Sequence, residues 1–250
     1  MIEVTIIGTG ALARNLYHAF IESDQVHLQI IGRSKEALQF FTNSTTTTDF
    51  KKAKLSEVIL LAVSDSAIKE CEAAIGVHQS VIAHCAGSFP LNNLTSENAG
   101  VFYPLQTYND KSFVNFDSVP VLLEAKNKKT FNALKNLASI LSTDVRELDS
   151  NKRKEAHLAA VFANNFSNYL FGLSKELLTD FELPGDLLNE LILQTAKNAV
   201  AFDPKMIQSG PARRKDLETI EEHLKMIKDP NHKKRYEQLS NAIKDLYNEL

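Results

Sequence analysis

The sequence has few of the features that mark disulfide-rich, metal-cluster or nucleic-acid-binding proteins. It holds two cysteines and no tryptophan in 250 residues, and Cys71 and Cys85 have neither a CxxC spacing nor histidines beside them. We therefore expect no disulfide framework and no metal site, and interpret both cysteines as reduced thiols. Basic charge is not in excess, because the chain has 28 lysines and arginines and 31 acidic residues. Neither nucleic acid nor an anionic membrane is expected as a partner, and a small molecule is favoured.

Long apolar runs are missing as well. The chain opens directly into the strand-like segment 2–7, with no basic leader, no bilayer-spanning stretch and no cleavage-site pattern. These absences predict a cytoplasmic protein. What is present is 44% hydrophobic and 24% charged residues, a mixture typical of globular proteins. A chain of this length has room for two domains.

The first half of the chain has an α/β pattern. Short β-branched segments bounded by turn residues alternate with helical patterns, which predicts a doubly wound, mostly parallel sheet covered by helices. Segments 57–63 and 80–85 are almost wholly apolar, as expected for central strands. The predicted strands are 2–7, 26–32, 45–49, 57–63, 80–85, 100–103, 119–124 and 143–148.

The second half has a helical pattern throughout. We find no convincing strand after Asp149, and proline or glycine pairs separate the apolar periodic stretches. An α/β domain is therefore predicted for residues 1–150 and an all-helical domain for residues 151–250. The predicted helices are 151–181, 186–202, 213–228 and 231–249.

A glycine-rich turn follows the first predicted strand. The segment Gly8-Thr9-Gly10-Ala11-Leu12-Ala13 matches G-x-G-x-x-A, in which the second glycine lets the backbone approach a pyrophosphate and the final small residue lets the helix pack closely. A helix beginning there points its free N–H groups at the phosphates. The alternative is a tight turn without a ligand. The position after the first strand favours a Rossmann dinucleotide-binding domain.

The end of the second strand indicates which dinucleotide is bound. Gly32-Arg33-Ser34 stands where an NAD site usually places a carboxylate on the ribose 2′-hydroxyl. The guanidinium of Arg33 and the hydroxyl of Ser34 suit a 2′-phosphate instead, so NADP(H) is predicted. The alternative for Arg33 is a solvated surface charge.

Two later segments end strands at the same predicted edge. Ser64 and Asp65 are expected to lie along the dinucleotide or, alternatively, to cap a helix. His84-Cys85-Ala86-Gly87 could leave room for a nicotinamide ring, although His84 could equally be a buried, hydrogen-bonded histidine. The predicted cofactor contacts are Gly8, Thr9, Gly10, Ala11, Leu12, Ala13, Gly32, Arg33, Ser34, Val63, Ser64, Asp65, His84, Ala86 and Gly87.

A polar stripe marks the first helix of the second half. His157, Asn164, Asn165 and Asn168 share one face of an uninterrupted helix within an otherwise apolar segment. Reduction of C=O or C=N needs a proton donor, for which His157 is our candidate, with Asn164 and Asn165 holding the developing charge. The alternative is a hydrogen-bonded packing cluster.

Other polar residues are candidates for binding the substrate. Gln106 and Thr107 follow the sixth strand, and Arg213 lies in a turn rich in glycine, proline and positive charge, where it could meet an anionic group. Asn168 completes the predicted substrate contacts. The alternatives are a loop that only packs and a plain connection between helices.

Taken together, these segments resemble a family of Rossmann-like oxidoreductases with a C-terminal domain called DUF2520, among the 6-phosphogluconate dehydrogenase-like and pyrroline-5-carboxylate reductase-like enzymes. The resemblance implies NADP(H) between the two domains and a homodimer formed mainly by the helical domains. It does not supply the substrate. The matching segments are GTGALA at 8–13, GRS at 32–34, AVSD at 62–65, HCAG at 84–87, YPLQT at 103–107, HLAAVFANNF at 157–166 and SGPARRKD at 209–216.

Two departures separate the chain from individual relatives. Ser209-Gly210-Pro211-Ala212 looks like a motif of pyrroline-5-carboxylate reductase, but here it follows two helices. The lysine and asparagine that ketopantoate reductase and β-hydroxyacid dehydrogenases space four residues apart are missing, because Lys154 is followed by Leu158 and Lys152 by Ala156. The sequence thus predicts an NADP(H)-dependent oxidoreductase for a small anionic carbonyl or imine, or alternatively a non-catalytic NADP(H) sensor or scaffold.

Overall fold

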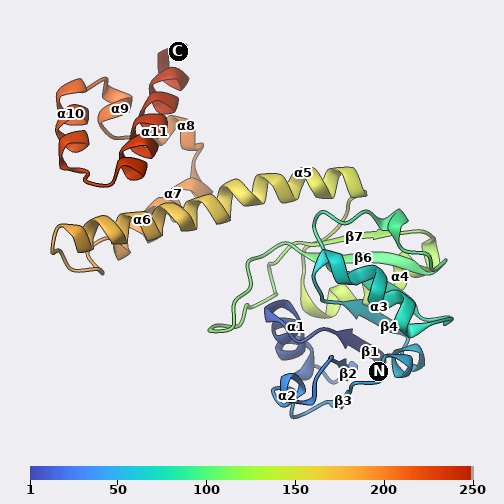
Figure 1. Cartoon of the computed structure of the whole chain (residues 1–250). Helices are drawn as coiled ribbons and strands as arrows, with labels where there is room; N and C mark the ends of the chain where they lie inside the picture. Colours follow the sequence, from blue (N-terminus) through green and yellow to red (C-terminus); the bar gives the residue numbers. More distant parts are fainter. Residues whose placement is uncertain (249–250) are drawn as a thin grey trace. The chain divides into compact units, whose positions relative to one another are not determined.

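The computed structural model describes residues 1–248 and separates into two compact units, Met1–Val161 and Phe162–Leu250 (Figure 1). The first unit is built on an eight-stranded sheet with the strand order β3-β2-β1-β4-β5-β6-β7-β8. The α/β class and the helical second half are confirmed. The strands are β1 (Ile2–Ile7), β2 (Val26–Ile31), β3 (Thr45–Thr47), β4 (Val58–Leu61), β5 (Val81–His84), β6 (Ala99–Pro104), β7 (Val121–Ala125) and β8 (Val145–Glu147).

The sheet is parallel except between β6 and β7. The exception follows from the connection, because a parallel return needs a crossover helix and the segment between Pro104 and Val121 contains none. β7 therefore runs back beside β6, pairing Tyr103 with Leu122. All eight strands predicted from the sequence are present; six are one to three residues shorter than expected, β1 has its predicted bounds and β6 is longer.

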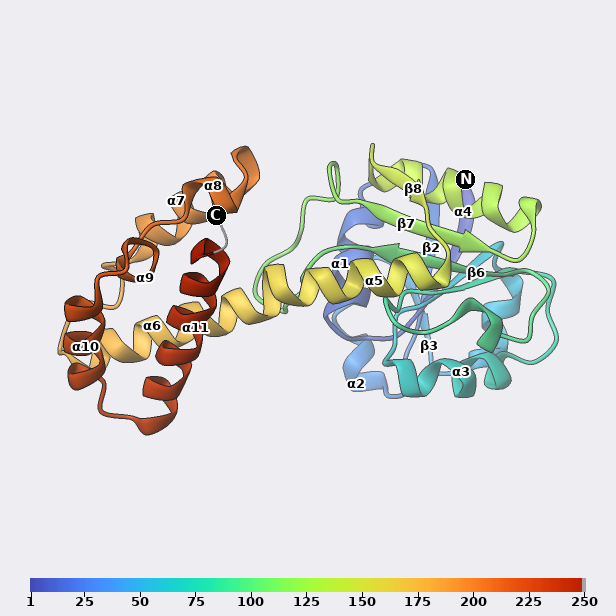
Figure 2. The same cartoon turned by 90° about the horizontal axis from the view of Figure 1, so that it is seen from above.

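Helices cover both faces of the sheet, which explains the unbroken apolar strands. Neighbouring residues of one strand enter opposite cores: Leu60 packs with α1 and α4 on one face, and Leu61 packs with α3 on the other. Figure 2 gives a second view of these layers. The helical elements of this unit are α1 (Ala11–Ile21), α2 (Lys35–Leu38), η1 (Phe50–Leu55), η2 (Asp65–Ala67), α3 (Ile68–Ile75), η3 (Leu91–Asn93), α4 (Lys128–Leu141) and α5 (Ser150–Ala160).

The change from strands to helices comes at Ser150, where α5 begins, but the compact units divide later, between Val161 and Phe162. Val161–Phe166 (η4) is π-helical and joins α5 to α6, so the division falls within one continuous helical segment. A π-turn closes hydrogen bonds five residues apart and so changes the phase of the helix. The uninterrupted helix predicted over residues 151–181 is corrected at this point.

The second unit is entirely helical over its described residues. Few of its apolar side chains are buried, among them Leu178 and Ile220, while many large ones remain exposed. None of the helices in residues 1–248 has the length and apolar character that crossing a bilayer requires. The elements are α6 (Ser167–Asp180), α7 (Asn189–Ala201), α8 (Pro204–Ile207), α9 (Pro211–Arg214), α10 (Leu217–Met226) and α11 (Pro230–Asn248); the predicted final helical residue, Glu249, lies outside the described residues.

Candidate active site

A pocket of about 800 Å³ lies at the carboxyl edge of the sheet. It is lined by the segments that follow β1, β2 and β4, where the chain order of the strands reverses. Loops at such a switch point diverge to opposite faces of the sheet and leave a crevice that nucleotides occupy in this class of fold. The glycine-rich turn predicted from the sequence forms the part of the pocket after β1.

Gly8 and Gly10 have different structural reasons for being glycine. Gly8 has φ of +133°, and a Cβ there would lie 2.2 Å from the carbonyl oxygen of Ala62 on the neighbouring chain segment. A Cβ on Gly10 would meet no atom within 4 Å. Gly8 is thus required by the turn itself, whereas the missing side chain of Gly10 leaves open space in the pocket at the N-terminus of α1.

The segment after β2 forms the next part of the pocket. Gly32 packs closely, because a Cβ there would lie 2.7 Å from Cγ2 of Thr9. The Arg33 side chain is exposed at the pocket and makes no hydrogen bond or ion pair with any residue in 1–248. The hydroxyl of Ser34 accepts a hydrogen bond from the backbone N–H of Ala37 and so caps α2. Its own hydrogen remains available to a ligand.

Several pocket residues were not found by sequence reasoning. Phe50, Ala67, Cys71 and Ala74 form a largely apolar wall from η1, η2 and α3, and Glu70 adds a carboxylate. Burial raises the pKa of the Cys71 thiol, which keeps it protonated. These residues come from elements without a recognised motif, so no local pattern identified them. Together with the glycine cradle and the free guanidinium, the wall gives the pocket the composition that a dinucleotide needs.

Five of the predicted cofactor contacts do not line this pocket: Ala13, Asp65, His84, Ala86 and Gly87. Ala13 is buried where α1 packs on the sheet, as its small size requires. His84 is fully buried, its Nδ1 accepts from the Ala86 N–H at 3.2 Å, and its ring meets Phe89 edge to face. Burial, assisted by the positive charge of Arg153, lowers the pKa of His84 to about 3. His84 therefore fits the alternative interpretation from the sequence, that of a buried, hydrogen-bonded histidine.

Gly87 belongs to a different contact, beneath the candidate proton donor. Nδ1 of His157 lies 3.0 Å from the hydroxyl of Tyr103 on β6. A Cβ on Gly87 would lie 2.7 Å from this Nδ1 and 3.0 Å from Cζ of Tyr103. The absence of a side chain at Gly87 therefore allows both rings to approach the carboxyl ends of β5 and β6. Because all three residues lie in the first unit, this edge carries the glycine cradle and His157 together.

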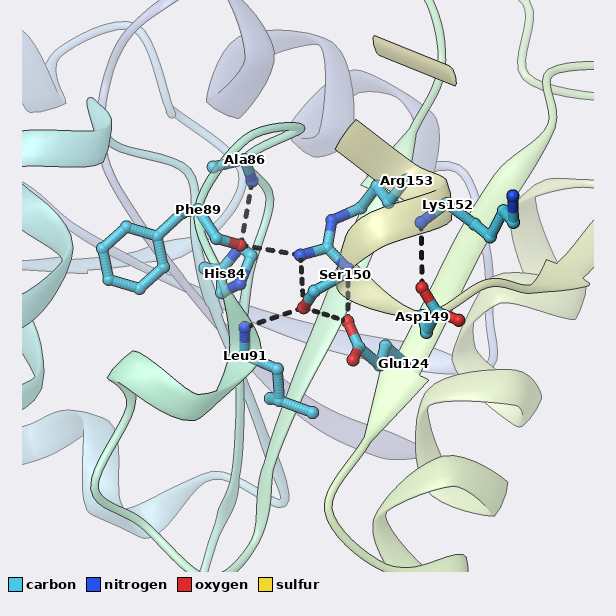
Figure 3. A network of polar contacts seen from close by, with 9 residues as sticks. All are labelled: His84, Ala86, Phe89, Leu91, Glu124, Asp149, Ser150, Lys152 and Arg153. Atoms are coloured by element: carbon cyan, nitrogen blue, oxygen red, sulfur yellow. Dashed lines mark hydrogen bonds and ion pairs between the residues drawn. The ribbon is translucent and has the colours of Figure 1, made fainter. Parts of the chain in front are cut away.

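A buried polar network holds α5 in place one turn before His157 (Figure 3). The guanidinium of Arg153, only 1% exposed, forms an ion pair with Glu124 of β7 and donates to the carbonyl oxygen of Phe89 at 2.7 Å. Ser150 bonds to the same carboxylate and accepts from the N–H of Leu91. These contacts join α5 to β7 and to the segment after β5. Sequence reasoning missed Arg153 because its partners are distant in the chain.

The remaining predicted site residues are exposed. The side chain of Gln106 accepts from the backbone N–H of Thr107 at 2.8 Å, so part of its capacity serves its own loop. Asn164, Asn165 and Asn168 are exposed and make no side-chain hydrogen bond within residues 1–248. The alternative of a hydrogen-bonded packing cluster is therefore not seen for these amides, and π-helical Val161–Phe166 interrupts the continuous α-helix on which the polar stripe was predicted.

Arg213 lies in the second unit, where its guanidinium stacks on the ring of Tyr247 at 4.1 Å from the centroid. The side chain is exposed and lies in the last turn of α9. Gly210, with φ of +99°, precedes α9, and the single helix predicted over residues 213–228 is divided into α9 and α10 at Lys215, which is left-handed. Stacking leaves the N–H groups of Arg213 free to bind an anion.

A second hollow of about 590 Å³ lies at the opposite, amino edge of the sheet and is lined in part by Lys69 and His78. Its buried carboxylate, Glu72, already accepts from the backbone N–H groups of Thr95 and Ser96. No set of three or more histidine, cysteine or acidic side chains among the described residues is arranged to hold a metal ion. The carboxyl edge therefore remains the candidate site.

The fold and the pocket define a Rossmann-type protein with a helical C-terminal unit, and comparison with known proteins identifies its family. A family model described as "Domain of unknown function (DUF2520)" matches residues 119–243. A candidate NADP oxidoreductase from Bacteroides fragilis is 34% identical, with 98% of each chain covered and a TM-score of 0.89. The chain belongs to the DUF2520 family. No curated protein matches the chain.

More distant solved structures share the fold. Pyrroline carboxylate reductase from Plasmodium falciparum, solved with NADP bound, is 15% identical with a TM-score of 0.66, covering 97% of this chain and 98% of that one. An imine reductase from Myxococcus stipitatus, in complex with NADP+, is 13% identical with a TM-score of 0.67, covering 99% and 93%. At sequence identities of 15% and 13%, these two structures show that the fold is shared and nothing more.

Proposed function

We propose that the protein is an NADP(H)-dependent oxidoreductase that acts on a small carbonyl or imine compound. The observation that carries the proposal is the open cradle at Gly10, which lies at the switch point of the sheet and at the start of α1. A pyrophosphate there would accept hydrogen bonds from the free N–H groups of the first helical turn. The candidate NADP oxidoreductase from Bacteroides fragilis and the NADP-bound reductases of the same fold support this proposal.

The preference for NADP(H) over NAD(H) rests on Arg33. Its guanidinium has no partner within residues 1–248 and stands after β2, beside the ribose end of such a cofactor. A 2′-phosphate would form charge-assisted hydrogen bonds with it. Glu70 is the acidic member of the pocket lining, but it comes from α3 and not from the end of β2, where NAD sites place their carboxylate.

His157 is proposed as the proton donor in this reaction. Bound NADPH would supply a hydride to the carbonyl or imine carbon, and the imidazole would protonate the oxygen or nitrogen. Asn164 and Asn165 are proposed to stabilise the developing charge, and their exposed, unpaired amides support that role. Gln106, Thr107, Asn168 and Arg213 are proposed substrate contacts, with Arg213 meeting an anionic group.

A second copy of the chain is the proposed protein partner. The helical unit exposes large apolar side chains, and removing them from water would stabilise the protein. Leu191 and Val200 on α7, for example, are 62% and 90% exposed. A homodimer formed through this unit would remove them from water.

Absorbance of NADPH during a screen of 2-oxo acids and cyclic imines tests the proposed function. We expect at least one compound to be reduced, and we expect a His157→Gln variant to lose at least about a hundredfold in turnover, the usual contribution of a general acid. A variant with full turnover would remove His157 from this role. Tight NADPH binding with no turnover across the screen would support the sensor or scaffold alternative instead.

A further inference from the structure

The hydroxyl of Tyr103 has a single hydrogen-bond partner within residues 1–248, and that partner is His157. Tyr103 is held by the strand ladder, since its backbone pairs with Leu122 of β7. His157 is held by the first turns of α5, which Arg153 and Ser150 fasten to Glu124. Tyr103 and His157 are therefore each held in position by interactions other than the hydrogen bond between them.

The protonation state of the tyrosine permits a hydrogen bond from its O–H to Nδ1 of His157. Burial raises the pKa of Tyr103, and the nearby charge of Arg153 opposes that rise while Asp65 adds to it. The phenol consequently stays protonated at neutral pH and has one O–H to donate. Nδ1 of a neutral imidazole is the acceptor within reach, at 3.0 Å. No residue in 1–248 forms a hydrogen bond with Nε2 of the same ring.

We propose that Tyr103 is a positioning residue that fixes the neutral tautomer of His157, with Nδ1 accepting from the tyrosine and the hydrogen carried on Nε2. Gly87 is part of the arrangement, because a side chain there would occupy the space of the imidazole Nδ1 and the phenol ring. The consequence for catalysis rests on the proposed function, whereas the tautomer itself does not.

Before any proton is transferred in that reaction, Nε2 carries a hydrogen whether the ring is neutral or an imidazolium. The neutral ring donates a hydrogen bond that polarises C=O or C=N. The imidazolium transfers its proton: the N–H bond at Nε2 breaks, an O–H or N–H bond forms on the substrate, and the ring becomes neutral. The neutral ring left by this transfer is the other tautomer, with its Nδ1–H donated to the Tyr103 oxygen, and uptake of a proton from solvent at Nε2 restores the imidazolium. A hydroxyl serves here because it can donate to Nδ1 in one state and accept from it in the other.

The chain contains a second pair of the same kind, which provides an internal control. Nδ1 of His223 on α10 lies 2.8 Å from the hydroxyl of Tyr236 on α11, within the helical unit. This pair is remote in sequence from the carboxyl edge of the sheet. A Tyr236→Phe variant therefore removes a phenol that contacts a histidine Nδ1 without touching His157; unlike Tyr103, Tyr236 also bonds to Ser240.

Nitrogen NMR of the full chain labelled with ¹⁵N-histidine tests the proposal at mildly alkaline pH, where neutral rings dominate. The seven histidines give separate ring signals, and those of His157 are assigned by their loss in His157→Gln. In the wild-type protein we expect Nδ1 to resonate as a bare nitrogen and Nε2 as a protonated one, with a wide separation. In Tyr103→Phe the two tautomers mix, so this separation narrows; in Tyr236→Phe it stays unchanged.

A protonated Nδ1 in the wild-type protein would overturn the proposal, and this measurement needs only the His157→Gln variant, for the assignment. An unchanged separation in a folded Tyr103→Phe variant would overturn it as well. NADPH titration of the same wild-type sample tests the proposed function separately from the role of Tyr103. Failure to bind NADPH contradicts the proposed function and leaves the tautomer result as it is, whereas NADPH binding with the wrong tautomer contradicts only the role of Tyr103.

Discussion

Gly87 lies directly under His157, so close that a Cβ on the glycine would be 2.7 Å from Nδ1 of the imidazole. The same atom would be 3.0 Å from Cζ of Tyr103. Gly87, which the sequence suggested as a cofactor contact, thus makes room for two side chains. The contact explains why small residues follow β5 at this edge.

Gly87→Ala is expected to destabilise the protein by about 1–3 kcal/mol, the usual cost of overpacking. The methyl group must displace His157 or Tyr103, because their rings occupy its position. Urea unfolding measures the loss. Gly172→Ala is the matched control, since its Cβ would meet nothing within 4 Å on α6 and should raise the stability slightly. An unchanged stability in Gly87→Ala would contradict the described packing.

Arg153→Met is expected to cost about 3–5 kcal/mol in the free energy of unfolding, because it leaves the partly buried carboxylate of Glu124 without its counter-charge. The double variant Arg153→Met/Glu124→Leu removes both charges and should lose less than the single one. Urea unfolding of the three proteins gives the comparison. A single variant that loses under about 1 kcal/mol would show that the ion pair does not hold α5 on the sheet.

The pKa of His84, lowered from 6.5 to about 3, makes stability depend on pH. Between these values the unfolded chain binds a proton that the folded chain does not, so the free energy of unfolding falls as the pH is lowered. The slope from this residue approaches about 1.4 kcal/mol per pH unit. Urea unfolding between pH 7 and pH 5 should show a steeper fall for the wild-type protein than for His84→Gln. Equal slopes would mean that His84 is not buried as a neutral ring.

The wild-type protein is expected to be a dimer by light scattering, and Leu191→Glu/Val200→Glu is expected to be a monomer. Both side chains are exposed on α7, where two carboxylates would be buried at great cost in an interface. Val77→Glu is the control, because Val77 is 95% exposed in the first unit and should leave the dimer intact. A monomeric wild-type protein would contradict the proposed partner.

Local patterns in the sequence were sufficient for the fold and for the glycine cradle. The strands were predictable because covered strands such as β4 are apolar on both faces, and Gly8 was recognisable because the turn tolerates no Cβ. Arg33 could also be recognised from its local sequence, because it stands after β2 at the position where an NAD site has a carboxylate. Each of these features lies within one strand and the turn after it.

The rest of the site depends on contacts between distant segments. Tyr103 and His157 are 54 positions apart, and nothing near either residue indicates the other. Arg153 has the local sequence of a surface arginine, yet Glu124 and Phe89 bury it. The π-turn at Val161–Phe166 was unpredictable from periodicity, because the apolar pattern of that segment also fits an α-helix.

The most direct test of the account is a fluorescence titration with NADPH and NADH of the wild-type protein, Arg33→Ala and Gly10→Val. We expect the wild-type protein to bind NADPH more tightly than NADH, Arg33→Ala to lose most of that preference, and Gly10→Val to fold normally but bind neither cofactor well, because its side chain enters the open cradle. Equal binding of NADPH and NADH by the wild-type protein, or full NADPH affinity in Gly10→Val, would contradict an NADP(H) site at this edge of the sheet.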